Sequence, residues 1–230
     1  MKFGILVFPG SNCDHDAYHA AAHILGASAT FIWHKETDLQ KSDVIIVPGG
    51  FSYGDYLRSG AIAKYSPIMK SVTDFANNGG IVIGICNGFQ ILLESSLLPG
   101  AMLHNDQLKF VCKQTFIKVK SNATPFTSQI DINKVLQIPV AHGEGNYFID
   151  SDGLKELQDN NQIVFTYCNE NGLETKESNP NGTINNIAGI CNKNGNVLGM
   201  MPHPERAVEK LIGSDDGLLL FKSILELSSI

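Results

Sequence analysis

The sequence predicts an α/β fold, with a central and mainly parallel β-sheet that is flanked by helices and continued by a mixed or antiparallel extension. Up to Gly100, short apolar runs rich in β-branched residues alternate with helix-compatible stretches, as crossover connections in a parallel sheet require. After Gly100, five strand-like runs follow with few helices between them, which favours antiparallel pairing. No Pro- or Ser-rich linker divides the 230 residues, so we expect one domain over residues 1–230.

The first half of the chain is predicted to alternate between strands and helices. An apolar first strand at residues 1–8 is followed by a helix at 13–25, which Gly26 ends. Pro67 suits the first turn of a second helix, which the glycines at 79 and 80 close. The other strands are expected at 30–33, 44–47 and 81–85, and the second helix at 67–77.

The second half is predicted to be mostly strands, followed by one helix. The strands are expected at residues 110–119, 134–140, 163–167, 187–191 and 197–201. A final helix at 215–227 should turn five apolar side chains inward, namely Leu218, Leu219, Phe221, Ile224 and Leu225. The stretch 169–186 is dense in Asn, Gly and Glu, so it is interpreted as an exposed loop.

Composition excludes several classes of protein. The formal net charge is −6 and no cluster of Lys or Arg occurs, which argues against binding to nucleic acid or to an anionic membrane. The first apolar run is too brief for a signal peptide and far too brief to span a bilayer. Five cysteines, an odd number without a C-x-x-C pair, indicate neither a disulfide framework nor a zinc site, so a reducing cytoplasm is expected.

Cys86 is the candidate nucleophile. It follows the apolar strand at 81–85 and precedes a helix-compatible segment, so we expect it on a sharp strand-to-helix turn. Gly84 and Gly88 lack the side chains that would collide when this turn folds back on itself. The thiol should therefore stand exposed at the sheet edge, where the helix N-terminus favours a thiolate. The alternative is an inert buried cysteine after a core strand.

His203 and Glu205 are the candidate base and its orienting carboxylate. His203 follows the strand at 197–201, and in an extended segment Glu205 would share its face, with Pro204 fixing φ between them. A carboxylate in that place orients an imidazole and stabilises its charged form. The pair His142 and Glu144 has the same spacing and is the main rival for both roles.

These motifs resemble the class I, or triad-type, glutamine amidotransferases, whose fold is flavodoxin-like. The resemblance rests on Gly84-x-Cys86-x-Gly88-x-Gln90 together with His203-Pro204-Glu205. Longer blocks are similar to the separate glutaminase subunit of phosphoribosylformylglycinamidine synthase, and the likeness extends over almost the whole chain. These blocks start at Pro9, Pro48, Cys86, Ala141 and Gly199.

The resemblance implies roles for the residues around the nucleophile. Backbone N–H groups near Gly50 or Phe51 would join the N–H of Asn87 as an oxyanion hole. Gln90 would contact the substrate glutamine, although capping or packing of the helix is the alternative. His142 would line the glutamine pocket or its partner-facing mouth. Gly49-Gly50 lacks the spacing of a dinucleotide-binding or P-loop motif, which leaves a plain structural turn as the other interpretation.

The resemblance also implies a substrate and partners. Glutamine would be hydrolysed to glutamate and ammonia, with no metal and no organic cofactor in this chain. A large synthetase subunit would use ATP and Mg²⁺ to convert phosphoribosylformylglycinamide to the amidine, often together with a small third subunit. Two alternatives stay open: a free-standing cysteine peptidase or γ-glutamyl hydrolase, and a non-catalytic regulatory partner.

Two further features have a surface interpretation. His15, His19 and His23 recur every four residues on the first predicted helix, roughly opposite its apolar face, so a solvated stripe is favoured over a zinc site. Residues 50–60 combine glycines with aromatic residues and an arginine, which favours a surface that responds to a partner protein.

Overall fold

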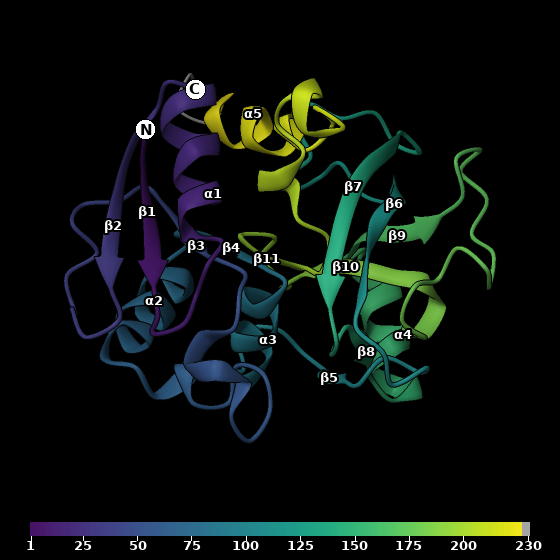
Figure 1. Cartoon of the computed structure of the whole chain (residues 1–230), viewed down its shortest axis with the longest axis horizontal. Helices are drawn as coiled ribbons and strands as arrows, with labels where there is room; N and C mark the ends of the chain where they lie inside the picture. Colours follow the sequence, from purple (N-terminus) through teal and green to yellow (C-terminus); the bar gives the residue numbers. More distant parts are fainter. Residues whose placement is uncertain (227–230) are drawn as a thin grey trace.

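The computed structural model describes residues 1–226 and is built on a mixed sheet of nine strands in the order β2-β1-β3-β4-β11-β10-β9-β6-β7 (Figure 1). The first five of these strands are mutually parallel. Their bounds are β2 (Ser28–Trp33), β1 (Lys2–Val7), β3 (Val44–Val47), β4 (Ile81–Ile85) and β11 (Val197–Met200). Counted along this half, the order is the 2-1-3-4-5 of flavodoxin-like sheets, which confirms the predicted fold class.

The antiparallel extension begins on the far side of β11. Strand β11 pairs parallel with β4 on one edge and antiparallel with β10 on the other, so it forms the boundary between the two halves of the sheet. Strand β11, which precedes His203, is therefore shared by the parallel and the antiparallel halves of the sheet. The remaining strands pair antiparallel throughout and are β10 (Ile187–Cys191), β9 (Ile163–Cys168), β6 (Val111–Val119) and β7 (Val135–His142).

Helices cover both faces of the parallel half. Figure 1 shows α1 (Asp14–Tyr18) beside α5 (Leu218–Glu226) on one side, with α2 (Pro67–Asn77) and α3 (Asn87–Glu94) on the other. A π-helix, η1 (His19–Ile24), continues α1 directly. Over residues 1–226, no helix has the length and apolar character needed to cross a lipid bilayer.

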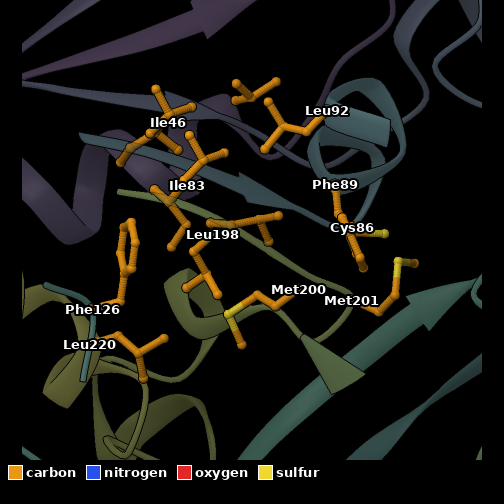
Figure 2. Close-up of a cluster of buried hydrophobic side chains, with 14 of the residues drawn as sticks. Ile46, Ile83, Cys86, Phe89, Leu92, Phe126, Leu198, Met200, Met201 and Leu220 are labelled. Carbon is orange, nitrogen blue, oxygen red and sulfur yellow. The ribbon is translucent and has the colours of Figure 1, made fainter. Parts of the chain in front are cut away.

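The core lies between the parallel strands and these helices. All four residues of β3 are buried, as are the last four of β4, because helices cover both faces of these strands. Ile46, Ile83 and Leu198, from three neighbouring strands, pack together in Figure 2. Burying each such side chain contributes about 1.5–3 kcal/mol. Cys86 lies at the edge of the same cluster, beside Phe89.

Several elements differ from the sequence-based expectations. Helix α4 (Ser151–Asp159) and the small sheet of β5 (Ala101–Leu103) with β8 (Asn146–Phe148) were not predicted, because α4 is largely polar and these strands have three residues each. Helix α5 begins at Leu218, and Leu220 is buried in place of Leu218 and Leu219. Leu227 lies outside the described residues.

The stretch 169–186 is only partly an exposed loop. Asn181 within it is fully buried and donates a hydrogen bond of 2.7 Å to the carbonyl oxygen of Gly145. Asn179 donates to the carbonyl of Thr183, so the polar side chains fold the segment back on itself. The prediction of an exposed loop was wrong for this part because asparagine is typical of loops. Here the asparagine side-chain amides bond backbone carbonyl groups in place of strand-to-strand hydrogen bonds.

The turn at Cys86 is strained and tightly packed, as predicted. Cys86 has φ 51° and ψ −106°, a conformation that L-residues rarely adopt and that costs of order 1–3 kcal/mol. A Cβ on Gly88 would lie 1.8 Å from the carbonyl oxygen of Val47, and one on Gly84 would lie 2.7 Å from the carbonyl oxygen of Gly88. Helix α3 can therefore approach β3 only because position 88 has no side chain.

We predict that Gly88→Ala lowers the free energy of unfolding by about 3 kcal/mol or more, because the methyl group meets the backbone of a core strand that cannot move. Urea unfolding followed by circular dichroism measures this change. Gly143→Ala is the matched control, since a Cβ there meets only Phe110 at 3.8 Å, and it should shift stability by less than about 0.5 kcal/mol. Equal stability of the two variants would contradict the packing argument.

Candidate active site

The carboxyl ends of the parallel strands converge on one cavity of about 150 Å³. Each of four strands in the parallel half is followed by a segment that lines it: β1 by Asn12 and Cys13, β3 by Gly50, β4 by Cys86 and β11 by His203. The antiparallel extension adds Ala141 and His142 at the end of β7. This is the position at which open α/β sheets bind ligands.

Cys86 is nearly buried, with 6% of its surface exposed. The expectation of an exposed elbow is therefore wrong, because the antiparallel extension reaches over it. The Cys86 Sγ lies 3.6 Å from the carbonyl oxygen of Ala141, to which the thiol donates, and Phe51 and Phe110 line the same cavity. The thiol thus faces an enclosed space.

His203 and Glu205 form a buried pair, both 2% exposed, with His203 Nδ1 2.7 Å from Glu205 Oε1. Because the carboxylate accepts this bond, Nδ1 carries the proton and Nε2 is the free nitrogen of the neutral ring. The segment Pro204–Arg206 is a turn of 3₁₀ helix, so the predicted side-by-side placement is observed but its extended geometry is not. The backbone N–H of His203 donates to the backbone carbonyl of Pro139 on β7, and this bond anchors the turn.

The surroundings of His203 favour its charged form. Burial by itself would lower the pKa of His203, but the carboxylate of Glu205 and the negative form of the Cys86 thiol outweigh it and raise the pKa well above its usual value. Within the described residues, the buried Nε2 has no partner in full hydrogen-bond geometry, although the Cys13 and Cys86 side chains lie close enough to raise the pKa of the ring further. It is therefore placed to exchange a proton with a group in the cavity.

His142 lies in the same cavity but in a different electrostatic state. Its Nδ1 donates to Asn105 Oδ1 at 3.1 Å, and its Nε2 lies 3.5 Å from the side-chain nitrogen of Asn181. Burial, followed by the nearby charge of His203, lowers the pKa of His142 to about 4. With both nitrogens engaged and the ring neutral, His142 is less suited than His203 to act as a base.

The residues predicted around the nucleophile also lie at the site. Gly50 and Phe51 line the cavity, and Gly50 has φ +111°. A Cβ on Gly50 would lie 2.5 Å from the backbone nitrogen of Asn12 and 2.9 Å from its Oδ1, so the two loops approach this closely only because position 50 is a glycine. Gly49, the residue before it, approaches the triad more closely, since a Cβ there would lie 2.7 Å from His203 Cε1.

Asn87 and Gln90 connect helix α3 to the surrounding loops. The Asn87 side-chain nitrogen donates to Gln90 Oε1 at 2.9 Å and to Asp55 Oδ1 at 3.2 Å. The Gln90 side-chain nitrogen donates in turn to the backbone oxygen of Glu144. Gln90 is buried yet lines the cavity, so it both packs against the loop that follows β7 and faces the enclosed space.

Cys13 and Arg206 were not assigned roles from the sequence, although both lie in the motif blocks. Arg206 Nη2 donates to Cys13 Sγ at 3.2 Å, and Arg206 Nε donates to Asp16 at 2.8 Å. Burial raises the pKa of Cys13. The signal that could have found Cys13 is its position just after β1, at the same sheet edge as Cys86 and His203.

Cys13, His203 and Glu205 bring potential metal ligands within 4.8 Å of one another. A thiolate, an imidazole and a carboxylate are a donor set that zinc uses in proteins. Here the guanidinium of Arg206 already contacts the Cys13 sulfur, and Glu205 already holds His203. A cation in this place would have to displace Arg206 and break the His203–Glu205 bond.

The histidine stripe lies outside the cavity. The His15 side chain is 84% exposed, whereas His19 Nε2 lies 2.6 Å from Glu209 Oε1. The Nδ1 atoms of His19 and His23 are 3.2 Å apart. Ala17 and Ala21 of the same helical segment are buried, as predicted for its apolar face.

Known proteins resemble the chain over most of its length. Residues 1–215 match the CobB/CobQ-like glutamine amidotransferase domain. The phosphoribosylformylglycinamidine synthase subunit PurQ of Salinibacter ruber is 56% identical over 229 residues, which cover 100% of this chain and 97% of the relative. The PurQ subunit of Moorella thermoacetica is also 56% identical, over 98% of this chain and 96% of its own. The structure of PurLQS from Thermotoga maritima matches with a TM-score of 0.86 and 42% identity, covering 99% of this chain and 98% of that chain.

We predict that His203→Ala slows the alkylation of Cys86 by iodoacetamide at pH 7 about tenfold or more. The raised pKa keeps His203 charged at neutral pH, and an opposite charge beside a thiol favours its reactive thiolate. His142→Ala should change the rate less than about threefold, because that ring is neutral. Mass spectrometry of the Cys86 peptide gives both rates. A larger effect of the His142 substitution would reverse the assignment of the base.

Proposed function

The chain belongs to the family of CobB/CobQ-like glutamine amidotransferase domains, and from this membership we infer that it is the glutaminase subunit of a phosphoribosylformylglycinamidine synthase. It hydrolyses glutamine and supplies ammonia for a step of purine biosynthesis. The observation that carries its chemistry is the buried, unpartnered Nε2 of His203 in the cavity that also holds the Cys86 thiol.

The first half of the reaction forms a thioester. The Cys86 sulfur attacks the side-chain amide carbon of glutamine, and the amide oxygen becomes negative in the tetrahedral intermediate. Backbone N–H groups near Gly50 and Phe51, with that of Asn87, stabilise this oxygen; losing one such donor costs about 10²–10³ in rate. His203 Nε2 gives its proton to the departing nitrogen, and ammonia leaves.

The second half releases glutamate. His203, now neutral, takes a proton from water, whose oxygen attacks the thioester carbon. The carbon–sulfur bond breaks, glutamate departs and the thiolate–imidazolium pair is restored. Glu205 holds the ring with Nδ1 protonated throughout, as the carboxylate of a triad does, which supports its role as orienter.

The ammonia needs an acceptor on another subunit. We assign ATP and Mg²⁺ to the synthetase subunit, which converts phosphoribosylformylglycinamide to the amidine, and no cofactor to this chain. The likeness to the PurLQS structure supports assembly with that subunit and with a small third subunit. The full-length likeness to PurQ subunits favours this function over a γ-glutamyl peptidase.

The extent and location of the protein are part of this proposal. We treat residues 1–230 as one glutaminase domain, and the continuous sheet that joins both halves of the chain supports that assignment. A cytoplasmic location is supported by the reaction itself, because the nucleophile must stay a free thiol and reducing compartments maintain free thiols.

We predict that Cys86→Ala abolishes glutamine-dependent synthesis but keeps most synthesis from added ammonia, because the thiol acts only in producing ammonia. The reconstituted assembly is assayed for amidine formation with each nitrogen source. Cys112→Ala, which removes an exposed cysteine of β6, is the control and should retain both activities. Loss of both activities in Cys86→Ala, with the assembly intact by gel filtration, would contradict the assignment.

We also predict that the isolated chain is a poor glutaminase and that the synthetase, the small subunit, ATP and phosphoribosylformylglycinamide together activate it about tenfold or more. In the free chain, the stacked rings of Phe51 and Phe110 line the cavity, with centroids 6.3 Å apart. The adjoining Tyr56 and Leu57 are exposed and suit a partner surface. The rate of steady-state glutamate release measures this activation. Full activity of the chain alone would contradict the prediction and favour a free-standing hydrolase.

A further inference from the structure

We propose that Asp55 recognises the α-ammonium group of glutamine and so makes the site specific for the free amino acid, with Glu144 strengthening the negative field around it. This assignment rests on the proposed function and deepens it. Asp55 lies in the strained loop after β3. The sequence alone did not point to either residue as a ligand of the substrate's ammonium group. Asp55 lines the cavity, and Glu144 borders it through Gln90, whose side-chain nitrogen donates to the Glu144 backbone oxygen.

The lining of the cavity combines reactive groups with an acidic side chain. Cys86 and His203, whose buried Nε2 has no hydrogen-bond partner within residues 1–226, mark where the reacting carboxamide must sit. Arg206 also lines the cavity, and Cys13 and Asp16 hold its guanidinium. Asp55 lines the same cavity next to Gln90, through their shared partner Asn87. A glutamine whose carboxamide lies at Cys86 can place its ammonium group beside Asp55, because both residues line the same cavity.

Asp55 lacks a cationic partner within residues 1–226, where no Lys, Arg or His forms an ion pair with it. Burial, followed by the charge of Glu144, raises the pKa of Asp55 to about 6. Glu144 is itself fixed in place, because its Oε2 accepts the backbone N–H of Ser59 at 3.2 Å. Glu144 already has His104 beside it, with His104 Nδ1 3.6 Å from Glu144 Oε1. Asp55 has no such partner in the part of the chain that the structure describes, and an ammonium group would supply the cation and form charge-assisted hydrogen bonds with its carboxylate.

If Asp55 only supported the loop, a substitution that keeps the loop but removes the charge would not weaken glutamine binding. Asp55 has φ 54°, in the left-handed region, and its Oδ1 accepts a hydrogen bond from Asn87. Asparagine tolerates the same backbone conformation, and its carbonyl oxygen accepts the same bond. Asp55→Asn therefore removes the charge while keeping the loop, so it separates recognition of the ammonium group from support of the backbone.

The test compares glutamine with glutaramate, which keeps the carboxamide and the carboxylate but lacks the α-amino group. In the reconstituted assembly, Asp55→Asn should raise the KM for glutamine about 10- to 100-fold and change kcat less than about threefold. The inhibition constant of glutaramate against glutamine hydrolysis should stay within threefold of native. Asp74→Asn makes the same chemical change on the exposed face of α2, where Asp74 pairs with Lys70, and should alter neither value.

Glu144→Gln keeps an acceptor for the Ser59 N–H and provides a second variant if Asp55→Asn fails to fold by circular dichroism. It should raise the KM for glutamine about threefold or more and leave glutaramate unaffected. Equal weakening of both compounds, or of neither, would overturn the assignment of Asp55 while leaving the glutaminase function standing. Failure of the native assembly to hydrolyse glutamine would instead refute the proposed function.

Discussion

The contact between helix α3 and strand β3 is the constraint on which the rest of the site depends. At Gly88 the helix backbone lies against the carbonyl of Val47, with no room for a single carbon atom between them. This contact holds the first turn of α3 over the sheet edge and forces Cys86 into its left-handed conformation. The burial of β3 and β4 supplies the free energy that maintains this strain. A nucleophile in a relaxed loop would not be held at the same point.

The other groups reach the nucleophile because parallel strands end at one edge. Strands β1, β3, β4 and β11 are separated in sequence but consecutive in the sheet order, so the segment after each of them reaches the same cavity. The antiparallel extension then covers this edge through the end of β7, which turns an open crevice into an enclosed space. Enclosure matters for the chemistry, because the field of Glu205 on His203 is stronger where water is excluded. The raised pKa of His203 thus reflects this field and that of Cys86, which together outweigh the lowering that burial causes.

Features that depend on local pattern were predictable from the sequence. The strands and helices of the first half, the sharp turn at Cys86 and the pairing of His203 with Glu205 follow from apolar periodicity, glycine placement and strand-end position. Features that depend on packing between distant segments were not: the burial of Cys86, the contact of Arg206 with Cys13, and the engagement of both His142 nitrogens by two asparagines. Asparagine-rich segments resemble loops in sequence, and only the fold shows that Asn181 is interior. The two His-x-Glu pairs have the same spacing but different surroundings, which raise the pKa of His203 and lower that of His142.

The position of β11 has a consequence for biosynthesis of the protein. This strand follows the other strands of the sheet in sequence, yet it is inserted between β4 and β10 in the middle of the sheet. The facing edges of β4 and β10 must therefore stay unpaired until residues near 200 have been translated, and such non-local pairing is slow and exposes strand edges meanwhile. The same order means that the thiol at position 86 exists for much of translation without its imidazole. A nascent chain that has not reached residue 203 consequently lacks the arrangement on which the proposed hydrolysis depends.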